Sequence, residues 1–165
     1  MQREIIVIAH NIRSIHNVGS IFRTCEGFGV KKLILSGYTP APGVGLPHVA
    51  KKIEEALHKT ALGAESIVPN EHINNIKTYL EGLRSNGFRI AGLEQNDNSI
   101  LLPNYNPPSK MALLIGEEVY GITKELIELC DDLVEIPMFG LKESFNVSVA
   151  TGVALYAIRS KPISK

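Results

Sequence analysis

The sequence carries no net charge, because 17 Lys and Arg residues balance 17 Asp and Glu residues among 165. A protein that grips polyanions over its whole surface is strongly basic, so this balance excludes that mode of binding. Any contact with nucleic acid must therefore be a local patch, which two subunits could share.

Cysteine is scarce as well: Cys25 and Cys130 lie far apart, with no C-x-x-C near either. This spacing excludes a disulfide framework and predicts two buried thiols in a reduced, cytoplasmic protein. The five histidines are not at zinc-binding spacing, and paired cysteines are lacking, so we expect no metal.

Long apolar runs and the common nucleotide motifs are also missing. The early run Ile5–Ala9 is too short for a signal peptide or a membrane span, so we expect no membrane association. No G-x-G-x-x-G follows the first predicted strand, and neither G-x-x-x-x-G-K-[ST] nor G-x-S-x-G occurs. Dinucleotide, P-loop and α/β-hydrolase sites therefore lose their usual support.

The sequence does contain alternating strand and helix patterns, in a length that suits one domain of residues 1–165, since roughly 100–200 residues make a domain. β-Branched runs bounded by turn formers predict strands at Glu4–Ala9, Lys32–Ser36, Arg89–Leu93, Met111–Ile115 and Leu133–Ile136. Apolar periodicity predicts helices at Asn17–Phe28, Glu71–Ser85, Thr123–Cys130 and Ser144–Arg159. The alternation indicates the α/β class, with a mostly parallel sheet and helices on both faces.

Ligands of such sheets bind beyond the carboxyl ends of the strands, so chemistry is expected in the loops there. These loops are His10–His16, Tyr38–Pro47, Gln95–Pro108, Gly116–Gly121 and Pro137–Glu143. Two segments, at Gly43–Gly45 and Pro103–Pro108, have the composition of mobile loops.

The first of three notable segments runs from His10 to Arg23. Asn17 can cap the helix, and Gly19 lets a neighbour approach its first turn. Arg23 lies four residues beyond Gly19 on the same face, so it can join the helix N-terminus in binding an anion such as a phosphate. A capped surface helix with a salt-bridged arginine is the alternative.

The second segment, Leu113–Ile122, is a buried strand that delivers a glycine and two carboxylates into a loop. Gly116 can let a flat ligand approach the backbone, and Glu117 or Glu118 can orient a hydroxyl or an arginine. A solvated acidic turn that caps the next helix explains the same residues.

The third segment, Glu135–Ala150, crowds Ser144, Asn146 and Ser148 into the start of an otherwise apolar helix. Ser144 can cap that helix, whereas asparagine inside a helix has poor propensity. Placement for function explains Asn146 better than capping combined with a buried hydrogen bond.

Together these segments resemble the SpoU family of the SPOUT methyltransferases. The family motif N-x-G-x-x-x-R is matched by Asn17, Gly19 and Arg23, and G-x-E-x-x-G by Gly116, Glu118 and Gly121. The third motif, I-P-M-x-G-x-x-x-S-L-N-V-S-V-A, is matched from Ile136 to Ala150 with Phe145 in place of leucine. Glu117 and Val119 also depart from common family residues.

The resemblance implies an enzyme that uses S-adenosylmethionine to methylate a ribose 2'-hydroxyl in RNA. It implies a C-terminal deep trefoil knot, a homodimer, and an active site shared between subunits. The cofactor-binding residues it implies are Leu93, Gly116, Ile136 and Phe145; the catalytic residues are Arg23, Asn17, Glu118, Ser144 and Asn146. The absence of an extra N-terminal substrate-binding domain favours tRNA over rRNA.

In the mechanism that we favour, Arg23 stabilises the developing alkoxide and a neighbouring phosphate, because an arginine side chain stays protonated. Ser144 or water then relays the proton. Two alternative hypotheses remain: a catalytically silent RNA- or cofactor-binding module on the same fold, and a flavodoxin-like nucleotide-binding regulator. Basic residues near the expected loops are candidates to face RNA: Arg3, Arg13, Lys31, Lys32, Lys51, Lys52 and Lys142.

Overall fold

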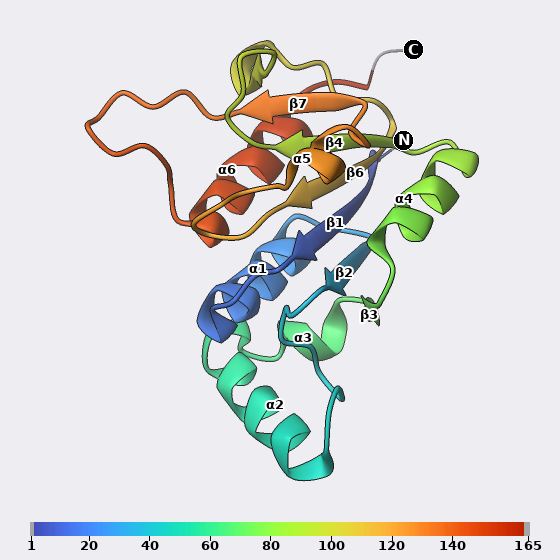
Figure 1. Cartoon of the computed structure of the whole chain (residues 1–165), viewed down its shortest axis with the longest axis vertical. Coiled ribbons are helices and arrows are strands. Elements are labelled where there is room, and N and C mark those ends of the chain that lie inside the picture. Colours follow the sequence, from blue (N-terminus) through green and yellow to red (C-terminus); the bar gives the residue numbers. More distant parts are fainter. Residues whose placement is uncertain (1, 164–165) are drawn as a thin grey trace.

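A computed structural model describes residues 2–163, which form a seven-stranded sheet with the strand order β3-β2-β1-β6-β4-β7-β5 (Figure 1). The strands are β1 (Glu4–His10), β2 (Lys32–Ser36), β3 (Asn70–Ile73), β4 (Arg89–Leu93), β5 (Ile100–Leu101), β6 (Lys110–Ile115) and β7 (Asp132–Glu135). The helices are α1 (Ile15–Gly27), α2 (Pro47–Ala61), α3 (Ala64–Ile67), α4 (Ile76–Ser85), α5 (Lys124–Ile127) and α6 (Val147–Ser160), with a 3-10 turn η1 at Leu102–Asn104. All six strand pairs run parallel, so the predicted α/β class is confirmed.

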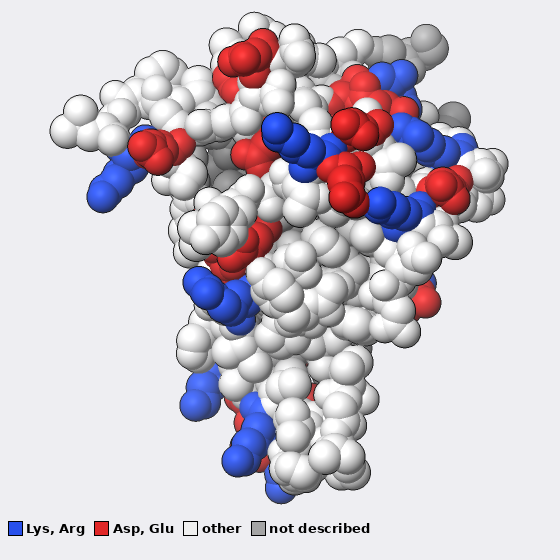
Figure 2. Space-filling model, in the orientation of Figure 1, with Lys and Arg blue, Asp and Glu red and all other residues white. Residues whose placement is uncertain are grey.

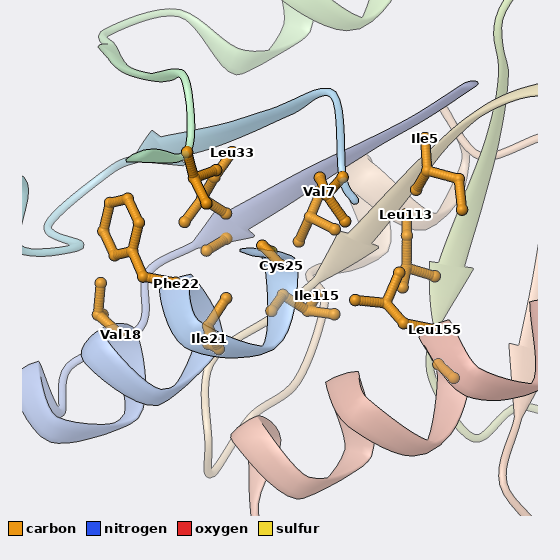
Figure 3. Packing of buried hydrophobic residues seen from close by; sticks show 14 of the residues in the cluster. Ile5, Val7, Val18, Ile21, Phe22, Cys25, Leu33, Leu113, Ile115 and Leu155 are labelled. Carbon is orange, nitrogen blue, oxygen red and sulfur yellow. The ribbon is translucent and has the colours of Figure 1, made fainter. Parts of the chain in front are cut away.

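The central strands are apolar and buried between their ends, as suits a sheet with helices on both faces. In β1, Ile5 and Val7 point into a core shared with α1, α2 and α6, whereas Ile6 and Ile8 point into a second core with α4 and α5. Figure 3 shows the first core. The strand order therefore places the carboxyl ends of β1, β4, β6 and β7 together.

Two helices begin at residues other than those that the sequence favoured. Ser14, not Asn17, caps α1, since the Ser14 hydroxyl accepts a hydrogen bond from the Asn17 backbone amide at 3.3 Å. Asn146, not Ser144, caps α6 through its bond from the Ser148 amide at 3.0 Å. Asn146 is thus the last residue before the helix, which removes the objection from its poor helix propensity.

The predicted helix over residues 71–85 is wrong in its first part. Residues Asn70–Ile73 pair with β2 as an edge strand, and α4 begins only after Asn75, whose side chain caps it. Helices α2 and α3 and strand β5 were not predicted. Much of α2 is polar, and it projects from the lower end of the molecule (Figure 1).

Arg3 is buried, with 3% of its surface exposed, so the prediction that it faces RNA is wrong. Its guanidinium donates to five backbone carbonyls, at Pro107, Pro108, Ile158, Lys161 and Pro162. These bonds tie β1 and the end of α6 to the segment at 103–108, which the sequence had indicated as a mobile loop. Across residues 2–163, each helix is too short or too polar to cross a lipid bilayer.

Candidate active site

A cleft of about 430 Å³ opens at the carboxyl ends of β4, β6 and β7. It is lined by residues 93–95, 115–121, 135–136, 138, 143–147 and 150. These residues come from three of the predicted loops and from the start of α6. The long segment between β7 and α6 extends away from the body beside this edge (Figure 1).

The loop after β6 is closed by its own backbone. Glu117 and Gly121 exchange two backbone hydrogen bonds of 3.2 and 3.0 Å. A Cβ on Gly116 would lie 2.4 Å from the Gly121 carbonyl carbon, so this turn itself requires a glycine at position 116. Glu94 secures the far side, because its carboxylate accepts the Ile122 amide at 2.7 Å.

Glu118 occupies the N-terminus of α1. Its carboxylate accepts the backbone amides of Arg13 and Ser14 and the side-chain amide of Asn17, each at 3.1 Å. The predicted anion at this helix start is therefore the protein's own carboxylate, which the helix dipole favours. It orients backbone amides and an asparagine, not an arginine side chain.

This position also sets the charge state of Glu118. Burial by itself would raise its pKa, but hydrogen bonds from two backbone amides and from Asn17 outweigh that effect and hold the pKa below its usual range. Glu118 is therefore ionised at neutral pH.

Asn146 joins the third segment to the first. Its side-chain nitrogen donates to Asn17 Oδ1 at 3.2 Å, and its oxygen accepts the Ser148 amide and hydroxyl at 3.0 and 2.7 Å. Because Asn17 also donates to Glu118, one chain of hydrogen bonds runs Asn146–Asn17–Glu118. Residues more than 100 positions apart in sequence thus meet beside the cleft.

The candidate residues divide into two groups. All four expected cofactor-binding residues, Leu93, Gly116, Ile136 and Phe145, line the cleft, and so do Glu118, Ser144 and Asn146. Asn17 contacts the cleft wall through its hydrogen bonds to Glu118 and Asn146.

Arg23 lies apart, in a second depression between α1 and α2 that Ser20, Thr24, Lys59 and Thr60 also line. Gly19 explains why these helices are so close: a Cβ there would lie 2.1 Å from Thr60 Oγ1. Gly19 therefore lets a neighbour approach the start of α1, as the sequence suggested, and that neighbour is α2.

Sequence reasoning missed two residues that shape the cleft. Glu94 braces the turn at Gly121, and Gln95 donates to the Glu143 carbonyl at 2.7 Å, which holds the segment before α6. Both follow directly after β4, at the start of a loop where chemistry was expected. Their polar side chains after a buried strand were the available signal.

Three features of the titratable side chains outside the cleft bear on the predictions: possible metal ligands, the two thiols and the surface charge. Among the described residues, no group of three or more His, Cys, Asp or Glu side chains could hold a metal ion. Cys25 is buried and Cys130 half-buried, and burial raises the pKa of both thiols, that of Cys130 to about 12. The face in Figure 2 mixes acidic and basic side chains over its upper part rather than presenting a field of one sign.

Known proteins were found that match this chain, in agreement with its fold and motifs. The SpoU rRNA Methylase family matches residues 4–156. A tRNA (guanosine(18)-2'-O)-methyltransferase from Aquifex aeolicus is 32% identical over 94% of this chain and 68% of its own length. Putative TrmH family tRNA/rRNA methyltransferases from Staphylococcus aureus are 29% identical over 94% of this chain, which spans 58% of their length.

Among solved structures, the A. aeolicus TrmH/SpoU tRNA modifying enzyme superimposes with a TM-score of 0.81 at 28% identity, over 96% of this chain and 75% of that one. The match to the family covers nearly all of the described residues, including the three segments that meet at the cleft. This chain belongs to the SpoU rRNA methylase family.

Proposed function

We propose that this protein transfers a methyl group from S-adenosylmethionine to a ribose 2'-hydroxyl in RNA, with tRNA favoured over rRNA as the substrate. The observation that carries the proposal is the hydrogen-bonded chain Asn146–Asn17–Glu118 at the wall of a cleft, in a member of the SpoU family. One relative named as a tRNA methyltransferase and a solved structure named as a tRNA modifying enzyme support the choice of tRNA.

The cleft suits the cofactor in size and in chemistry. Ligand pockets commonly enclose about 300–1,000 Å³, and this one encloses about 430 Å³. Apolar side chains such as Leu93 and Ile136 suit an adenine ring, with Gly116 and Phe145 beside them. Five glutamates also line the cleft and suit a cationic ligand: Glu94, Glu117, Glu118, Glu135 and Glu143. S-adenosylmethionine supplies an electrophilic methyl group on a positively charged sulfur.

Within this proposal Arg23 binds the substrate. Its permanently charged guanidinium stabilises the developing alkoxide and a neighbouring phosphate, and Ser144 or a water molecule relays the proton to bulk solvent. Asn17 and Glu118 fix the start of α1, and Asn146 fixes the start of α6. Their contribution is therefore to position the groups that react.

The separation of Arg23 from the cleft supports a homodimer. We propose that Arg23 of one copy acts beside the cleft of the other. Exposed apolar side chains at Val149, Val153 and Tyr156 recur along one face of α6, which packs beside α1, and they offer an interface for a second copy. The trefoil knot and a cytoplasmic location stay predictions of the same proposal.

Labelled S-adenosylmethionine incubated with the protein and bulk tRNA or rRNA tests the reaction. Alkaline digestion leaves a methylated dinucleotide intact only where the 2'-hydroxyl is blocked. We expect label in such dinucleotides with tRNA, its near-complete loss in Arg23→Ala, and normal activity in the surface control Lys124→Ala. Bound cofactor without any labelled RNA would instead favour a silent binding module.

Two further measurements test the roles of Arg23. Near-normal turnover in Arg23→Lys would contradict a bidentate role for the guanidinium. Mixing Arg23→Ala with Asn146→Ala tests the shared site: half of the dimers are then mixed, and one of their two sites is intact. Activity should return to roughly one quarter of the wild-type value. No recovery in verified mixed dimers would place Arg23 in the cleft of its own chain.

A further inference from the structure

Tyr38, in the turn after β2, is an exposed aromatic residue on a backbone that several hydrogen bonds hold in place. The Tyr38 amide donates to Asn11 Oδ1 at 3.3 Å, and the Asn11 amide donates to the Ser36 carbonyl at 3.1 Å. The buried Thr39 hydroxyl accepts the Ile12 amide at 3.0 Å and lies 2.8 Å from the Ser36 carbonyl. The two loops that follow β1 and β2 are thereby fixed to each other.

Two left-handed backbone conformations help to fix these loops. Asn11, in the loop after β1, has a φ of +58°, which is uncommon for a residue other than glycine, and Gly37, in the turn after β2, has a φ of +65°. A Cβ on Gly37 would lie 1.8 Å from Asn11 Oδ1, so only glycine fits. His72 Nε2 lies 3.1 Å from the Gly37 carbonyl and braces the outer side. These contacts hold the backbone of the turn that carries Tyr38.

Tyr38 and Arg13 lie on two loops that are bonded to each other through Asn11. The Arg13 amide donates to Glu118, which lines the cleft together with Glu117. Tyr38 is 55% exposed, and Arg13 is exposed as well. Partial desolvation and the carboxylates of Glu117 and Glu118 raise the pKa of the Tyr38 phenol, while the Arg13 guanidinium opposes them, which agrees with this placement. An exposed ring on a fixed backbone and an exposed guanidinium thus lie beside the cleft.

This combination fits an unpaired nucleotide. Bases of single-stranded RNA stack on aromatic side chains, and phosphates bind arginine. A tyrosine on a fixed turn loses little entropy when a base stacks on it, which is the advantage of preorganisation. An exposed tyrosine in a free loop would not suggest such a role.

We propose that Tyr38 and Arg13 bind the nucleotide next to the methylated one, with its base stacked on Tyr38 and its phosphate at Arg13. This inference rests on the proposed function only in taking RNA as the substrate. It gives a role to Arg13, one of the basic residues expected to face RNA, and adds Tyr38; neither residue belongs to the three family motifs.

The test compares Tyr38→Ala, Tyr38→Phe and Arg13→Ala with Lys124→Ala as the surface control. Filter binding of labelled bulk tRNA measures affinity, and the methylation assay gives KM for RNA and for S-adenosylmethionine. Loss of one base stack should weaken tRNA binding and raise KM for RNA about 5- to 150-fold in Tyr38→Ala. Tyr38→Phe should stay near the wild-type values, because it keeps the ring.

Arg13→Ala should weaken tRNA binding and lower the slope of log affinity against log salt by about one, since one phosphate contact is lost. KM for S-adenosylmethionine should stay within about twofold in all variants, because these side chains contact RNA rather than cofactor. Thermal melting confirms that each variant is folded.

Several outcomes would overturn the proposal. Wild-type affinity in Tyr38→Ala would exclude stacking, and an equal loss in Tyr38→Phe would assign the effect to the hydroxyl. If the wild-type protein binds tRNA without methylating it, the proposed reaction fails, whereas this inference is still decided by the binding data. If it binds neither tRNA nor rRNA, both fail.

Discussion

Replacing Glu118 by glutamine removes an acceptor from the start of α1. One carboxylate oxygen accepts the Ser14 amide and the Asn17 side chain, and the other accepts the Arg13 amide. Glutamine offers one oxygen and one NH₂ group, so whichever way it turns, its NH₂ faces a donor. At least one of the three donors loses its partner, and the negative charge at the helix N-terminus disappears.

The cost follows from these contacts. A hydrogen bond to a charged group contributes about 1.5–3 kcal/mol, and water can replace part of it at a half-exposed position such as this one. We therefore expect Glu118→Gln to lower the free energy of unfolding by about 1–2 kcal/mol, or Tm by roughly 2–8 °C for a domain of this size. Urea unfolding at pH 7 should show a lower midpoint with an unchanged m value.

The pH dependence gives an independent check. Because the pKa of Glu118 is lower in the folded than in the unfolded protein, its stabilisation is present above the unfolded value of about 4.3. It is lost as the pH falls through the folded value. The difference in unfolding free energy between wild type and Glu118→Gln should therefore shrink as the pH is lowered from 7 towards 3.

A matched control separates this effect from a general loss of charge. Glu128 is exposed, and Glu128→Gln should change the unfolding free energy by no more than about 0.5 kcal/mol. Equal stability of Glu118→Gln and wild type at pH 7, or a difference that does not vary with pH, would refute the role assigned to this carboxylate.

Two substitutions and one labelling experiment test the packing. Gly19→Ala places a Cβ 2.1 Å from Thr60 Oγ1 and 2.6 Å from a carbonyl oxygen of α2. Thermal melting should therefore show a loss of about 1–3 kcal/mol in the free energy of unfolding. Unchanged stability would mean that α2 moves aside at little cost. Arg3→Met leaves five carbonyls without their donor and should cost about 2–4 kcal/mol in urea unfolding, against which a neutral result would count. Cys25 and Cys130 should react with Ellman's reagent at pH 8 only after unfolding in guanidinium, because burial keeps both thiols protonated; rapid labelling of the native protein would contradict this.

The strands that the sequence predicts well are those buried on both faces. β1, β2, β4 and β6 carry continuous apolar runs, and their bounds agree with the prediction to within one residue. The edge strands were missed for a physical reason. β3 reads Asn-Glu-His-Ile, which has no apolar pattern, and β5 is only the two residues Ile100–Leu101, too short to show a period, so only pairing with a neighbour makes them strands.

In the site, as in the sheet, the local sequence predicted some features, whereas others depend on contacts between residues far apart in the chain. The motifs indicated which polar residues gather at the strand ends, and Glu118, Ser144 and Asn146 do line the cleft. Which residue caps each helix was harder, because Ser14 and Asn17, or Ser144 and Asn146, are both good caps and local propensity does not separate them. For α6, the hydrogen bond between Asn146 and Asn17 favours Asn146 as the cap, and these two residues are 129 positions apart.

The balance of positive and negative charge bears on how this protein would bind RNA. Many of its cations are already used inside the molecule: Lys31, Lys32, Lys77, Arg84 and Arg89 form ion pairs with carboxylates, and Arg3 and Arg159 bind backbone carbonyls. Among the other cations, the exposed Arg13, Arg23 and Lys59 lie beside the two depressions. Because each phosphate contact adds about 0.7–0.9 to the salt slope, binding through these three cations alone should depend only modestly on salt. Such binding would leave much of the recognition to stacking and shape, in agreement with the stacking proposed for Tyr38.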